Sequence, residues 1–189
     1  MKGERRAVLD ACVLIPMPLA DTLLRMAESP SLFSPKWSQT IMDEVTRNLI
    51  QKWGMPPGKA QRRESELRRH FSEAWVEGYD PMIELMSNDP GDRHVLAAAA
   101  YSQSDLIITY NLRHFPANAL QPWRIEAQAP STFLRGLYER DPFLVVEKLQ
   151  DQAANVGLPL TRLLDSLATN VPSFVNWLRQ GKGITENRL

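Results

Sequence analysis

The sequence predicts an α/β protein with a mainly parallel central sheet, followed by a small all-helical segment. From residue 6 to about residue 130, short apolar runs alternate with longer amphipathic stretches, the pattern of βαβ units. Beyond Asp141 only helical periodicity remains. We therefore divide the chain into a main domain at residues 1–135, a helical module at 141–180 and a flexible tail at 181–189.

The expected elements follow one another in a regular order. Apolar runs predict a first strand with the turn that leaves it at residues 8–14, and further strands at residues 32–35, 82–86 and 105–109, with a short last strand from residue 125. Helical spacing predicts helices at residues 19–27, 39–50, 59–76, 92–101, 142–154, 159–168 and 173–179. Ser38 is expected to cap the second helix, because a serine oxygen accepts a hydrogen bond from the free N–H groups of the first turn.

Composition sets the broad class of the protein. The 189 residues suffice for one ordinary domain with a small addition. The 22 basic and 22 acidic side chains cancel, so the overall charge neither supports nor excludes a nucleic-acid partner. No apolar run approaches the roughly 18 residues that span a bilayer, and the single cysteine, Cys12, rules out an internal disulfide. We expect a cytoplasmic protein that does not bind membranes.

Acidic and amide side chains fall where predicted strands end and helices begin. Asp10 follows the first apolar run, so its carboxylate lies at the edge of the sheet where open α/β folds bind ligands. Asp89 and Asp92 precede the Ala-rich helix, Glu44 lies on the helix after Ser38's strand, and an Asn follows a later strand. Because a buried, unpaired carboxylate is costly, this convergence predicts a divalent metal.

The donor types indicate which metal this would be. Carboxylates and waters suit Mg²⁺ or Mn²⁺, which can activate a bound water and neutralise the oxygens of a transferring phosphate. One cysteine and three scattered histidines (His70, His94 and His114) form no recognisable zinc ligand set. We therefore expect a metal site built without histidine.

Four stretches, taken in order, resemble the motifs of PIN domains. They are Val-Leu-Asp10-Ala-Cys-Val-Leu, Ser38 followed six positions later by Glu44-Val45, Asp89-Pro-Gly-Asp92-Arg-His-Val-Leu-Ala-Ala-Ala, and Ile-Ile-Thr109-Tyr-Asn111-Leu-Arg-His-Phe115. The chain is most similar in pattern to VapC-type ribonuclease toxins with an added C-terminal helical segment. The resemblance covers roughly residues 6–135.

This resemblance implies a three-layer α/β/α fold and a Mg²⁺- or Mn²⁺-dependent ribonuclease that hydrolyses RNA in line. On the family pattern, Asp10, Glu44 and Asp92 are the metal-binding acids, and Thr109 supplies the hydroxyl usually found beside them. The resemblance also implies a cognate antitoxin protein as partner.

Two positions leave alternatives within the site. Asn111 falls where many family members carry a fourth acid, so the number of metals stays open. Asp89 and Asp92 compete for the third acidic position. We favour Asp92, because its spacing from Leu96 places it on the buried side of the helix, while Asp89 could reach the metal through water.

Basic residues suggest where RNA would bind. Arg62, Arg63 and Arg69 crowd one predicted helix, and Arg113 and His114 follow the last long strand. The same helix contains several glutamates, so an exposed, salt-bridged helix is an equally good interpretation. The C-terminal helices could pack on the main domain or form a partner or homodimer surface.

Three rival functions are kept beside the toxin hypothesis. A housekeeping PIN nuclease in RNA maturation and a catalytically degenerate RNA- or protein-binding module share the fold. A haloacid-dehalogenase-like phosphatase also begins with an aspartate after its first strand, but it needs a second aspartate where this chain has Cys12.

Overall fold

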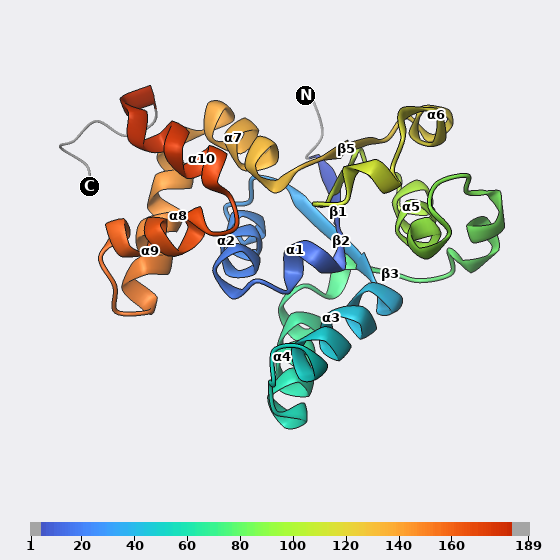
Figure 1. The fold of residues 1–189 in the computed structure, drawn as a ribbon, viewed down its shortest axis with the longest axis horizontal. Helices are drawn as coiled ribbons and strands as arrows, with labels where there is room; N and C mark the ends of the chain where they lie inside the picture. Colours follow the sequence, from blue (N-terminus) through green and yellow to red (C-terminus); the bar gives the residue numbers. More distant parts are fainter. Residues whose placement is uncertain (1–4, 183–189) are drawn as a thin grey trace. The chain divides into compact units, whose positions relative to one another are not determined.

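A parallel sheet of five strands forms the centre of the computed structural model, which describes residues 5–182 (Figure 1). The strands are β1 Arg6–Leu9, β2 Ser34–Ser38, β3 Trp75–Val76, β4 Leu106–Ile108 and β5 Glu126–Gln128. Their spatial order is β3-β2-β1-β4-β5, and every neighbouring pair is parallel. The predicted α/β class with a mainly parallel sheet is confirmed.

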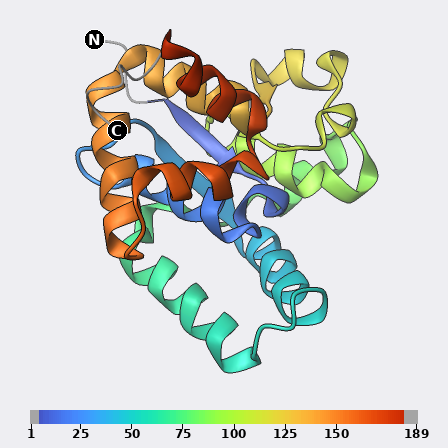
Figure 2. The same cartoon turned by 60° about the vertical axis from the view of Figure 1, so that its left-hand side comes forward.

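Helices flank this sheet as right-handed crossovers require. They are α1 Ala11–Leu14, α3 Gln39–Gln51, α4 Pro57–His70, α5 Arg93–Tyr101 and α6 Ala117–Leu120. The chain moves outward from β1 to β3 and then returns to β4, so the connecting helices lie on opposite faces, which gives the α/β/α arrangement. Helix α5 packs on β1, β2 and β4, whereas α3 packs on β2 and α1. Figure 2 shows α3 and α4 side by side as an antiparallel pair.

The strands at the centre of the sheet are largely apolar, as a sheet covered on both faces demands. Ala7, Val8 and Leu9 of β1 and all of β4 are buried. The strand order reverses at β1, so the carboxyl ends of β1 and β4 form the switch point at which open α/β sheets bind ligands.

The described chain forms two compact units. The first contains the described residues up to Ile15 together with Phe33–Gln128. The second contains Pro16–Leu32 and the described residues from Ala129 onward. Its helices are α2 Met17–Ala27, α7 Pro130–Arg140, α8 Pro142–Asn155, α9 Leu160–Ala168 and α10 Pro172–Trp177. A single boundary near residues 135–141 does not describe this division, because α2 belongs with the C-terminal helices.

Within the second unit, α2 packs on α8 and α9. The buried Thr22 Oγ1 donates a hydrogen bond of 2.7 Å to Gln152 Oε1, and Gln152 Nε2 donates to the carbonyl oxygen of Pro18 at 3.1 Å. A π-helical turn at Leu178–Lys182 ends the described chain. Most of the expected tail, residues 183–189, lies outside the described residues.

Several local predictions are confirmed and others are wrong. Helix α3 begins after Ser38, whose Oγ accepts a hydrogen bond of 3.3 Å from the backbone N–H of Ile41. The strand predicted at residues 82–86 is instead part of a 3₁₀ helix at Asp80–Leu85, with Pro81 in its first turn, where a missing N–H costs nothing. The helix predicted at 59–76 ends at His70, and helix α7 was not predicted.

The first apolar run also divides. Strand β1 ends at Leu9 and α1 starts at Ala11, with Asp10 extended between them (φ −67°, ψ 153°). Among residues 5–182, no helix has the length and apolarity needed to cross a bilayer.

Candidate active site

Asp10 lies directly beyond β1, at the carboxyl edge of the sheet. Its backbone N–H donates to the carbonyl oxygen of Ile108 at 3.1 Å, so the pairing of β1 with β4 continues up to Asp10. The residue is only 3% exposed. The strand pairing therefore fixes the position of a buried carboxylate at the switch point.

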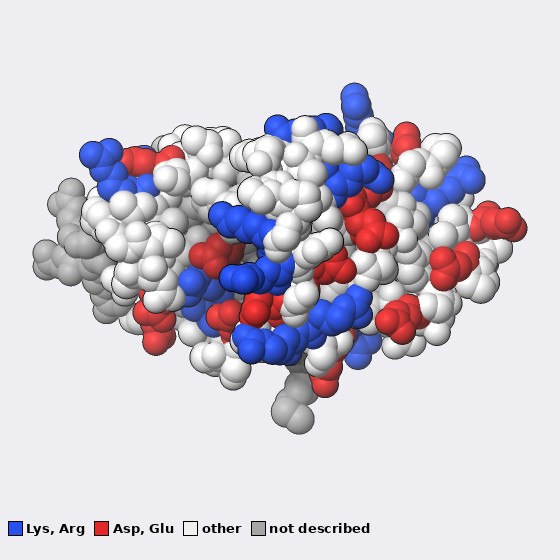
Figure 3. Space-filling view, turned by 90° about the horizontal axis from the view of Figure 1, so that it is seen from below, with Lys and Arg blue, Asp and Glu red and all other residues white. Residues whose placement is uncertain are grey.

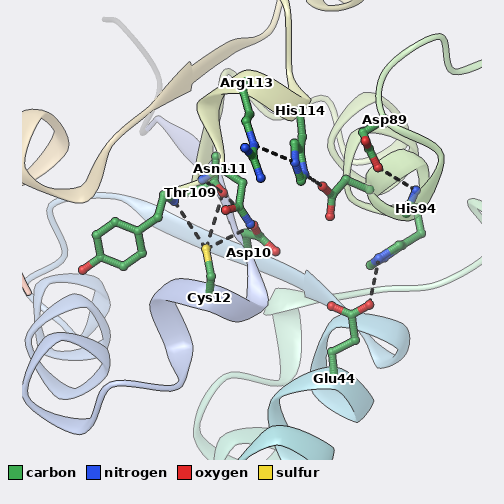
Figure 4. Close-up of polar contacts among 12 residues, drawn as sticks. Asp10, Cys12, Glu44, Asp89, His94, Thr109, Asn111, Arg113 and His114 are labelled. Carbon is green, nitrogen blue, oxygen red and sulfur yellow. Dashed lines mark hydrogen bonds and ion pairs between the residues drawn. The ribbon is translucent and has the colours of Figure 1, made fainter.

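Neutral groups hold the Asp10 side chain in place (Figure 4). Thr109 Oγ1 donates a hydrogen bond of 2.6 Å to Asp10 Oδ2, and Cys12 Sγ donates to the same oxygen at 3.2 Å. Thr109 Oγ1 in turn accepts from the backbone N–H of Asn111 at 3.0 Å, and Cys12 Sγ accepts from that of Tyr110 at 3.3 Å. These bonds join the residues after β4 to the residues after β1.

Burial and a neighbouring acid make the charge on Asp10 unfavourable. The pKa of Asp10 is raised above its usual range, first by burial and further by the negative charge of Asp92, although the Thr109 and Cys12 bonds oppose this. The pKa of Cys12 is raised to about 12 by burial and by the adjacent Asp10. A cation near Asp10 would favour its ionised form again.

A second group of ligand atoms gathers around Asp92. One ligand atom from each of Asp89, Asp92 and His114 lies within 4.8 Å of the others. His114 Nδ1 is 2.5 Å from Asp92 Oδ2, and His114 Nε2 accepts a hydrogen bond of 3.2 Å from Arg113 Nε. Asp89 Oδ1 accepts from the backbone N–H of Gly91 at 3.0 Å. The Arg113 bond to Nε2 implies that Nδ1 carries the proton toward Asp92.

Short turns create this second group. The 3₁₀ turn Leu112–His114 is closed by a bond of 2.8 Å from the backbone N–H of His114 to the carbonyl oxygen of Asn111. The backbone N–H of Asp89 then donates to the carbonyl oxygen of His114 at 3.2 Å. The loop before α5 and the turn after β4 are thus tied together at the acidic edge.

Glu44 reaches the same region from α3. Its Oε1 lies 3.4 Å from Nε2 of His94, which is on α5 (Figure 4). This is an ion-pair distance without hydrogen-bond geometry, since neither ring nitrogen of His94 forms a hydrogen bond among the described residues. Glu44 therefore meets the first turn of the helix that begins after Asp92.

The basic residues of α4 are only partly available to a ligand. Arg63 is half-buried, and it donates a hydrogen bond of 2.8 Å to the carbonyl oxygen of Leu14; burial lowers its pKa. Arg69 pairs with Glu66 at 2.6 Å, whereas Arg62 is exposed. Figure 3, viewed from the side on which α3 and α4 lie in Figure 1, shows basic and acidic groups intermixed. This pattern matches a salt-bridged helix better than a uniform basic surface.

Two residues at this edge make contacts that the sequence does not predict. The sequence alone assigns His114 to phosphate binding and expects a metal site without histidine, whereas the structure places the ring of His114 against Asp92. No role at the site is expected for Cys12 from the sequence, but its sulfur contacts both Asp10 and Thr109. The position of Cys12, two residues after Asp10 at the start of a helix, is the sequence signal that could have indicated its contact with Asp10.

Comparison with known proteins identifies the family. Residues 6–113 match the PIN domain model, so the chain belongs to the PIN domain family. It is also similar to the putative ribonuclease VapC50 of Mycobacterium tuberculosis (strain ATCC 25618 / H37Rv), with 42% identity over 106 residues. That alignment covers 53% of this chain and 62% of the relative's length. No solved structure shows a significant match.

Proposed function

We propose that this protein is a metal-dependent ribonuclease that hydrolyses phosphodiester bonds in RNA and acts in the cytoplasm as the toxin of a toxin–antitoxin pair. The observation that carries the proposal is the buried carboxylate of Asp10 beside Asp92, held only by neutral donors. Membership of the PIN family and the similarity to a putative ribonuclease support a nuclease.

The side chains of this edge fit a divalent cation. Asp10 is buried and electrostatically disfavoured in its ionised form, with a second acid near it, so a cation would relieve both penalties. Carboxylate oxygens are the ligands that Mg²⁺ and Mn²⁺ prefer. Asp10 and Asp92 would hold the ion, with Glu44 and Asp89 close by or acting through water. When bound, such an ion supplies an activated water and neutralises charge on the phosphate.

The remaining residues orient the two central acids. Thr109 fixes the rotamer of Asp10, and the backbone N–H of Asn111 fixes Thr109. His114 holds Asp92 through Nδ1, in the manner of the groups that commonly orient metal ligands. The guanidinium of Arg113, exposed beside His114, is available to pair with a phosphate oxygen.

The antitoxin would cover this edge. Tyr110 and Leu112, on either side of Asn111, are 41% and 43% exposed, an apolar rim that a partner segment could bury. Residues of the second unit could add to the antitoxin surface or to a homodimer. Capture of a small protein encoded beside this chain, and its inhibition of cleavage, would support the toxin assignment over housekeeping RNA maturation.

The decisive experiment compares RNA cleavage by the purified protein and by Asp10→Asn in the presence of Mn²⁺ or Mg²⁺. Asp80→Asn, which alters an exposed aspartate outside the site, is the matched control. We expect the control to cleave as the unaltered protein does, and Asp10→Asn to lose at least about a hundredfold in rate. If the unaltered protein neither cleaves RNA nor binds Mn²⁺, a degenerate binding module is the better description.

A further inference from the structure

A hollow of about 1130 Å³ lies at the amino edge of the sheet, opposite the edge that carries Asp10. Its walls come from the starts of β1, β2 and β3, from the residues before β4 and from the end of α4. Three cationic side chains line it, Arg6, Lys36 and Arg68. The hollow is open to solvent and belongs entirely to the first unit.

Neutral groups hold two of these cations. Arg6 NH1 donates a hydrogen bond of 3.3 Å to the carbonyl oxygen of Ser102, and Lys36 Nζ donates to that of Glu73 at 2.5 Å. The two cations also repel each other. The pKa of Lys36 is lowered first by burial and then by the charge of Arg6, with Glu73 opposing.

The third cation is held in a similar way. The guanidinium of Arg68 lies 3.8 Å from the ring centroid of Trp75, and its NH2 donates to Gln39 Oε1 at 2.5 Å. Stacking on an aromatic face and bonding to an amide fix a guanidinium without neutralising it.

Acids line the hollow as well, and a backbone N–H holds one of them. Glu73, Glu77 and Asp105 equal the cations in number, so the hollow has no formal net charge. Asp105 Oδ2, however, accepts from the backbone N–H of Arg6 at 3.0 Å. None of the ion pairs formed within residues 5–182 includes Arg6, Lys36 or Arg68. The three cations are therefore positioned but not paired.

We propose that this hollow binds backbone phosphates of the RNA substrate, as a second contact remote from the acidic edge. The inference rests on the proposed function in taking RNA as the substrate. Fixed, unpaired Arg and Lys groups are the usual partners of phosphate oxygens. Arg6 and Asp10 are separated by four strand residues, roughly 13 Å, so an RNA of several nucleotides can contact both edges. Because the hollow is open to solvent, it suits an RNA strand that extends beyond it better than a small ligand that must be enclosed.

The test measures binding without cleavage. Asp10→Asn protein is titrated, in chelator, with end-labelled single-stranded RNA at several salt concentrations, and fluorescence anisotropy gives the affinity. Adding Lys36→Gln or Arg68→Gln should weaken binding about fivefold each and reduce the salt slope by about 0.7 per lost phosphate contact. Lys52→Gln, an exposed lysine at the end of α3, is the matched control and should leave both unchanged.

Each outcome has a defined meaning. Equal affinities for Lys36→Gln and Lys52→Gln would overturn the inference, even where the unaltered enzyme cleaves RNA with Mn²⁺. Weakened binding together with absent cleavage would retain the phosphate site and remove the ribonuclease proposal. Should Lys36→Gln fail to fold, Lys36→Arg must keep the affinity. Displacement of RNA by inorganic phosphate at equal phosphate concentration would mean a small-anion site and overturn the RNA assignment.

Discussion

Thr109 Oγ1 donates a hydrogen bond of 2.6 Å to Asp10 Oδ2, although 99 positions separate the two residues in the chain. The bond exists because β1 and β4 are neighbours and both strands end at the same edge. The orientation of the central acid therefore depends on the strand order of the sheet and on one hydroxyl. This dependence can be tested directly.

Thr109→Val keeps the size of the side chain and removes the donor. We expect Mn²⁺ affinity to fall about tenfold, because groups that orient metal ligands contribute effects of this size. Since the Thr109 bond lowers the pKa of Asp10, its loss should raise that pKa further. Calorimetric Mn²⁺ titration checks the affinity, with Thr161→Val, at an exposed position of α9, as control. Equal affinity in both variants would show that the bond is dispensable.

Asp10 should destabilise the metal-free fold at neutral pH. Its pKa lies above the ordinary 3.8 in the folded protein, so the native state holds the proton more tightly than the unfolded chain does. The free energy of unfolding must then decrease as the pH rises from below 3.8 through the raised folded pKa.

Asp10→Asn removes this penalty. In chelator at neutral pH, we expect the variant to be about 1 kcal/mol more stable than the unaltered protein by urea unfolding. Saturating Mn²⁺ should reverse the order, because only the unaltered protein gains binding energy. A variant that is less stable in chelator would contradict the electrostatic account.

The thiol of Cys12 should be almost inert in the folded protein. Its pKa is raised from 9.0 to about 12, so at slightly alkaline pH its thiolate fraction, and with it the rate of alkylation, should drop about a thousandfold. Iodoacetamide labelling followed by mass spectrometry compares folded protein with protein in urea. In Asp10→Asn the labelling should become faster, since Asp10's charge is the second cause of the shift. Rapid labelling of the folded protein would be inconsistent with the contacts of the sulfur.

Arg63 and Arg62 are adjacent on α4, but substituting them should change the free energy of unfolding by different amounts. Arg63 donates to the carbonyl oxygen of Leu14, the last residue of α1, whereas Arg62 is exposed. Arg63→Met should lower the free energy of unfolding by about 1–2 kcal/mol, because it leaves a helix-end carbonyl without its partner. Arg62→Met should change it by less than about 0.5 kcal/mol. Urea unfolding of both variants separates the two expectations.

The sequence predicts the sheet edge well because its determinants are local. Asp10 ends an apolar run, so its place beyond β1 follows from strand length alone. The capping of α3 by Ser38 likewise depends on three neighbouring residues and is confirmed. Both features can be recognised without knowing any distant partner.

Short or turn-built features could not be predicted in this way. Strand β3 has two residues, too few for a period, and only its pairing with Trp37 and Ser38 makes it a strand. His114 meets Asp92 across 22 positions, because a 3₁₀ turn directs it back toward the loop before α5. No local sequence pattern predicts this contact between His114 and Asp92, since it depends on the positions of two loops in the folded chain.

The membership of α2 in the second unit has a consequence for how the chain is made. Residues 16–32, which include α2, leave the ribosome early. Helices α8 and α9, which cover α2, are among the last parts of the chain to be synthesised. The apolar face of α2 must therefore wait, uncovered, while the whole sheet forms. Nascent chains that stop before α8 would complete every strand of the sheet and still expose that face to chaperones and proteases.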